Sequence, residues 1–158
     1  ERTVTAEGPK TGDVIPVNTP THFATSLQFE TGVIASLQAS FDVWETNSAH
    51  LTIFGSEGTL RCPDPNTFGG PIQLLTGGAK EWQEIPVERP YTANSRGLGA
   101  ADLALSMRTG QPARASGELA YHVLDVMHAV LESADQGRHV AVESTVERPA
   151  PLEQAMKA

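Results

Sequence analysis

Three glycine-containing turns divide the first two-thirds of the chain into short segments, and they limit the possible folds more than any other feature. The turns fall at Thr31-Gly32, at Ser56-Glu57-Gly58 and at Gly77-Gly78. Glycine adopts the left-handed backbone angles of tight hairpin turns without steric cost. Because the flanking segments are β-rich, the three turns predict three successive hairpins, and therefore an open, mostly antiparallel sheet of about six strands.

The first predicted hairpin, residues 21–44, shows the clearest alternation of side chains. Apolar residues recur at every second position except Thr25, which places the apolar side chains of each strand on one face of the sheet. That face carries Phe23, Leu27, Phe29, Val33, Ala35, Leu37, Ala39, Phe41 and Val43. The opposite face carries Ser26, Gln28, Ser36, Gln38 and Ser40, together with Ile34 and Trp44. Short polar side chains with two apolar anchors are typical of a flat protein contact, so we expect a symmetric homodimer through this open face.

The last third of the chain has helical periodicity. Residues 97–110 predict a short helix, and residues 117–136 predict a long one with Ser116 as its N-cap and Gly137 just beyond its end. Strands followed by a block of helices are typical of an α+β fold with helices packed on one face of the sheet. The length of 158 residues suits one domain, residues 1–158, and residues 139–144 form a possible closing strand.

The long helix contains His122, Asp125 and His128, which at first suggest a metal site. The two histidines are six residues apart and point in different directions around the axis, whereas a zinc-binding helix needs histidines at i and i+4. Asp125, His128 and Glu132 are expected on a solvated face, and His122 at its border with a local partner. The opposite, packing face is expected to carry Leu119, Val123, Val126, Met127, Val130, Leu131 and Ala134.

Other catalytic and cofactor motifs are incomplete. The segment "GLGAAD" lacks the third glycine or alanine of a dinucleotide loop, because Asp102 stands at that position. A GxSxG nucleophile motif is absent, and Cys62 has no motif around it. The segment "CPDPNTFGG" is explained by turn formation rather than by calcium binding. We therefore expect no catalytic, cofactor-binding or metal-binding residue in this chain.

Composition excludes several partners. A net charge of −8 with eleven scattered Lys and Arg residues argues against a nucleic-acid surface. No apolar run approaches the roughly 20 residues of a membrane span. The single cysteine permits no internal disulfide and fits a reducing, cytoplasmic compartment. Two loops carry polar and aromatic groups suited to a sugar or polyol, and their pocket candidates are Trp44, Glu45, Asn94 and Arg96.

Three segments, in this order, carry a family resemblance: "GVIASLQASFDVW", "LTIFGSEGTLRCPDPN" and "RGLGAADLALSMRTGQPARASGELAYHVLDVMHAVLESADQGRHVAVES". Together they resemble the C-terminal domain of the glucose–fructose oxidoreductase and inositol dehydrogenase (Gfo/Idh/MocA) family, over about residues 21–144. The resemblance implies an NAD(P)-dependent oxidoreductase acting on a sugar, an inositol or a related polyol. In that family an N-terminal Rossmann domain binds the nucleotide, and the C-terminal sheet shapes the substrate pocket and mediates oligomerisation.

The chemical residues of that family have no counterpart in this sequence. Its nucleotide-binding glycine motif and the lysine of its EKP-type motif are absent here, and no DxxxH pair precedes the first long strand at Thr21. We therefore expect NAD or NADP only in the parent enzyme, with the 158 residues inactive by themselves. A stand-alone, non-catalytic binding or dimerisation module is the main alternative. A small self-sufficient hydrolase or metal enzyme is a second alternative.

Overall fold

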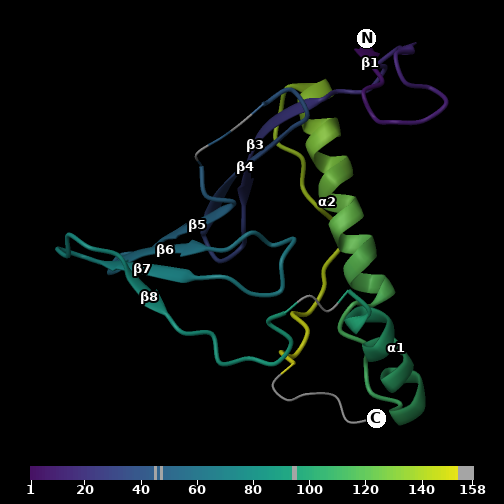
Figure 1. Cartoon of the computed structure of the whole chain (residues 1–158). Helices are drawn as coiled ribbons and strands as arrows, with labels where there is room; N and C mark the ends of the chain where they lie inside the picture. Colours follow the sequence, from purple (N-terminus) through teal and green to yellow (C-terminus); the bar gives the residue numbers. More distant parts are fainter. Residues whose placement is uncertain (45, 47, 94–95, 153–158) are drawn as a thin grey trace. The chain divides into compact units, whose positions relative to one another are not determined.

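The chain forms eight strands and two helices in the computed structural model, which describes residues 1–44, 46, 48–93 and 96–152 (Figure 1). Every strand pairing is antiparallel. These findings confirm an α+β fold with mostly antiparallel sheets. The elements are β1 (Arg2–Thr3), β2 (Val14–Ile15), β3 (His22–Gln28), β4 (Ile34–Ser40), β5 (Leu51–Phe54), β6 (Gly58–Cys62), β7 (Ile72–Thr76), β8 (Gln83–Ile85), α1 (Leu98–Thr109) and α2 (Gly117–Gln136).

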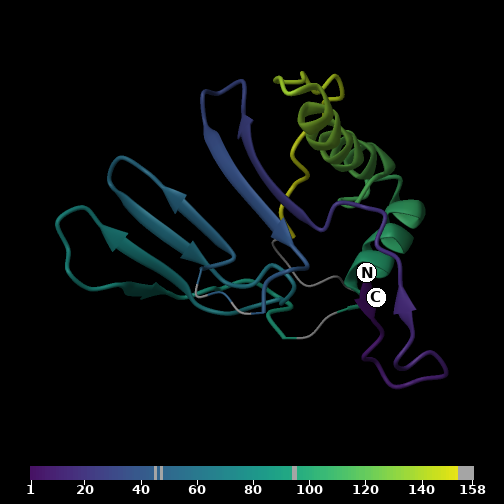
Figure 2. The same cartoon turned by 90° about the horizontal axis from the view of Figure 1, so that it is seen from above.

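The chain divides into two compact units, residues 1–47 and 48–158. The first unit contains the short pair β1-β2 and the long hairpin β3-β4, which Figure 2 shows as two extended strands. The predicted turn is confirmed: Gly32 has φ of 85°, and its N–H donates to the carbonyl of Phe29 at 2.9 Å. Arg2 joins the two strand pairs of this unit by donating to Asp42 at 2.6 Å.

The second unit contains a four-stranded sheet in the order β5-β6-β7-β8. The largest sheet among the described residues has four strands, and the expectation of about six strands in one sheet is not confirmed. The sequence alternation predicts strands, but it does not say which strand edges bond to each other. One face of the four-stranded sheet is apolar and carries Leu51, Ile53, Leu60, Cys62, Ile72, Leu74 and Ile85.

Both helices begin and end close to where the sequence predicts. Ser116 caps α2 by accepting a hydrogen bond from the N–H of Leu119 at 3.2 Å, and Gly137 ends it with φ of 61°. Gly110 ends α1 in the same left-handed conformation, with φ of 69°. Such caps satisfy backbone groups that have no partner within the helix, so local sequence alone fixes these boundaries.

The covered face of α2 matches the predicted face only in part: Leu119, Val126 and Val130 of that face are half-buried. Val123, Met127 and Leu131 are 51, 60 and 39 % exposed, although they belong to the predicted packing stripe. Asp125 was expected on the solvated face and is instead half-buried. The expected packing of this stripe over a sheet face is therefore not found among the described residues. His128 and Glu132 are exposed, as expected.

Residues 139–150 explain the rotation of the covered face. They form neither helix nor strand, so the prediction of a closing strand at 139–144 is wrong. This C-terminal segment instead runs beside α2, as the yellow chain in Figure 1 shows. Ser144 of the segment bonds to both His122 and Asp125. These polar contacts turn the histidine and the aspartate toward the segment.

Candidate functional site

The four pocket candidates have different outcomes. Trp44 belongs to the first unit and is fully exposed. Glu45 and Asn94 lie outside the described residues. Arg96 belongs to the second unit, in the turn directly before α1, and it has specific contacts. Of the four, Arg96 is therefore the residue whose side-chain contacts the structure describes.

The loop that receives Arg96 is residues 63–71, between β6 and β7. Asp64 organises it: its Oδ1 accepts from the N–H of Asn66 at 2.8 Å, and its carbonyl accepts from the N–H of Thr67 at 3.0 Å. The Thr67 hydroxyl donates to the same carbonyl at 2.7 Å. Aspartate and threonine form turns in this way because their short side chains reach the nearby backbone. The prediction that this segment is a turn is confirmed.

Arg96 crosses from its own turn to this loop. Its Nη2 donates to the carbonyl and to the side-chain oxygen of Asn66, at 3.2 and 3.0 Å. Its guanidinium carbon lies 5.8 Å from the centroid of the Phe68 ring, within cation–π range. Among the described residues no carboxylate forms an ion pair with Arg96. The arginine is thus held by neutral groups, and its charge remains uncompensated by a direct partner.

Two neighbouring contacts fix the frame around Arg96. A Cβ atom on Gly69 would lie only 2.5 Å from the carbonyl oxygen of Thr92, so glycine allows the two loops to approach closely. The Asp64 carboxylate has other partners: Oδ1 accepts from the Asn66 N–H within the loop, and Oδ2 lies 3.9 Å from Nε2 of His50. The loop therefore forms a platform that contacts Arg96 through Asn66 and Phe68.

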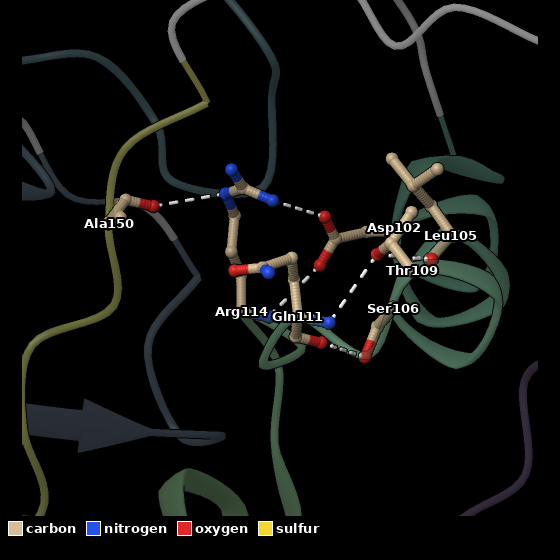
Figure 3. A network of polar contacts seen from close by, with 7 residues as sticks. All are labelled: Asp102, Leu105, Ser106, Thr109, Gln111, Arg114 and Ala150. Atoms are coloured by element: carbon tan, nitrogen blue, oxygen red, sulfur yellow. Dashed lines mark hydrogen bonds and ion pairs between the residues drawn. The ribbon is translucent and has the colours of Figure 1, made fainter.

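A second polar network lies at α1 and is shown in Figure 3. Asp102 is 8 % exposed, and it accepts from the Arg114 backbone N–H at 2.9 Å and from Arg114 Nη1 at 2.5 Å. Arg114 Nε then donates to the carbonyl of Ala150 at 3.0 Å. The backbone hydrogen bond from Arg114, followed by its guanidinium, lowers the pKa of Asp102. The segment "GLGAAD" is thus the start of a helix whose aspartate anchors a loop.

The histidine and aspartate of α2 form a third network with Ser144. His122 Nδ1 lies 2.9 Å from the Ser144 hydroxyl, and the Ser144 N–H donates to Asp125 at 3.1 Å. His122 is half-buried, as predicted, but its partner Ser144 is 22 residues away along the chain and not local. Hydrogen bonds from Ser144 lower the pKa of Asp125. The aspartate contacts the serine rather than the histidine, so the order of contacts is not that of a catalytic triad, in which the acid orients the base.

A row of polar side chains crosses the second face of the four-stranded sheet. Thr52 pairs with Arg61, Arg61 with Gln73, and Gln73 with Glu84, so one residue of each strand contributes to the row. The Arg61 guanidinium lies 4.1 Å from the centroid of the Trp82 ring. Sequence analysis did not single out Arg61 or Trp82, because their contact depends on which strands are neighbours.

Within the described ranges, no group of three or more His, Cys, Asp or Glu side chains is arranged to hold a metal ion. Likewise, neither α1 nor α2 combines the length and apolarity that crossing a membrane requires. Comparisons with protein-family models, with curated proteins and with solved structures found no match.

Proposed function

We propose that this chain is the C-terminal domain of a cytoplasmic, NAD(P)-dependent oxidoreductase of the Gfo/Idh/MocA type that acts on a sugar, an inositol or a related polyol. In the parent enzyme it shapes the substrate pocket and mediates self-association, while an N-terminal Rossmann domain binds the nucleotide. The order of segments over residues 21–144 supports the family. Arg96 on its loop platform supports a role in the pocket.

We assign the self-association to the polar row Thr52, Arg61, Gln73 and Glu84, in place of the hairpin face of residues 21–44 that the sequence suggested, because the row offers one cation and one anion that can match across a two-fold axis. The row contains one cation and one anion, each on a different strand. When two copies meet face to face about a two-fold axis, Arg61 can lie opposite the partner subunit's Glu84, and the reverse contact follows by symmetry. Opposite charges that match across an interface fix its register and disfavour other partners.

Charge reversal on this row tests the self-association. We expect the chain to sediment at about twice its mass of 16.8 kDa, and Arg61→Glu or Glu84→Arg alone to shift it toward the monomer. Either single change places like charges opposite each other across the interface. The double variant Arg61→Glu with Glu84→Arg restores the attraction and should restore the dimer.

Glu57→Arg, in the turn between β5 and β6, is the matched control. It changes the net charge as much as Glu84→Arg does, and it lies outside the row. It should leave the dimer unchanged. A wild-type chain that sediments as a monomer at high micromolar concentration would overturn the proposed self-association, as would a double variant that is no more dimeric than either single variant.

Nucleotide binding separates the oxidoreductase proposal from a stand-alone dimerisation module. The 158 residues contain no phosphate-cradling glycine motif, so calorimetric titration of the isolated chain with NADH should give no binding in the micromolar range. The full reading frame should add a Rossmann domain and bind NADH. A micromolar dissociation constant for the isolated chain contradicts the proposed division of roles, and a full-length protein that lacks a nucleotide domain favours the module.

A further inference from the structure

We draw no further inference here: the strongest candidate, the exposed apolar side of α2 that Val123, Leu124, Met127 and Leu131 form, is an unpartnered surface patch, and nothing in the described part of the chain shows what covers it.

Discussion

Replacement of Asp102 by alanine is expected to destabilise the unit 48–158 by about 2 to 3 kcal/mol. The Asp102 side chain is 10 % exposed and accepts hydrogen bonds from both the backbone and the guanidinium of Arg114. Removing one member of such a pair leaves the other desolvated and unpaired, and hydrogen bonds to charged groups contribute about 1.5 to 3 kcal/mol each. The Arg114 side chain is 38 % exposed, so water partly replaces the lost contacts and the expected cost is smaller than the sum of the two bonds.

Urea denaturation of the wild-type and variant chains measures this effect. Asp135→Ala, at the exposed end of α2, is the control and should shift the free energy of unfolding by no more than about 0.5 kcal/mol. The pKa of Asp102 is lowered from its ordinary value of 3.8. Its contribution is therefore complete above that value and is lost as the pH falls through the lower pKa of the folded state. A difference between wild type and Asp102→Ala that persists unchanged well below pH 3.8 would contradict this account.

Gly58→Ala is expected to cost about 1 to 3 kcal/mol, the range typical of an overpacked site. A Cβ atom at this first residue of β6 would lie 2.5 Å from the carbonyl oxygen of Leu75 and 3.2 Å from the Cα of Thr76. Both obstacles are backbone atoms of the neighbouring strand β7, so no flexible side chain can move aside. The strands must separate locally, at the point where Gly58 pairs with Thr76.

Gly99→Ala is the matched control for this second effect. Gly99 lies in the first turn of α1, and no atom within 4 Å would meet its added Cβ. Alanine is also the better helix former, so this variant should be neutral or gain up to about 1 kcal/mol. Equilibrium denaturation that ranks Gly58→Ala at or above Gly99→Ala in stability would show that β6 and β7 are not packed as described.

Local signals predicted the boundaries of the elements well. The turn at Gly32, the N-cap at Ser116 and the helix end at Gly137 all depend on residues within a few positions of each other. Their physical basis is short-range, since each is a backbone angle or a hydrogen bond to a nearby amide. The same holds for Asp64, whose side chain forms the turn that the sequence indicated.

Contacts between distant segments were less accessible to sequence reasoning. The covered side of α2 was misjudged because His122 and Asp125 find Ser144 about twenty residues later. Arg96 was identified as a pocket residue from its type and its loop, but its partners Asn66 and Phe68 lie some thirty positions earlier. Hydropathy gives the period of an element, and it does not identify the group that meets a particular polar side chain.

The attachment of the C-terminal segment has a consequence for how its sequence can diverge. Arg114 holds the segment through the carbonyl of Ala150, and Asp125 holds it through the N–H of Ser144. Both hydrogen bonds are made to main-chain groups of the segment. Every residue type except proline has both the main-chain N–H and the carbonyl. Substitutions along the segment therefore leave its route largely intact, whereas changes at Arg114, in the connection between α1 and α2, or at Asp125 of α2 release it. The path of this segment is encoded mainly in residues that lie outside it.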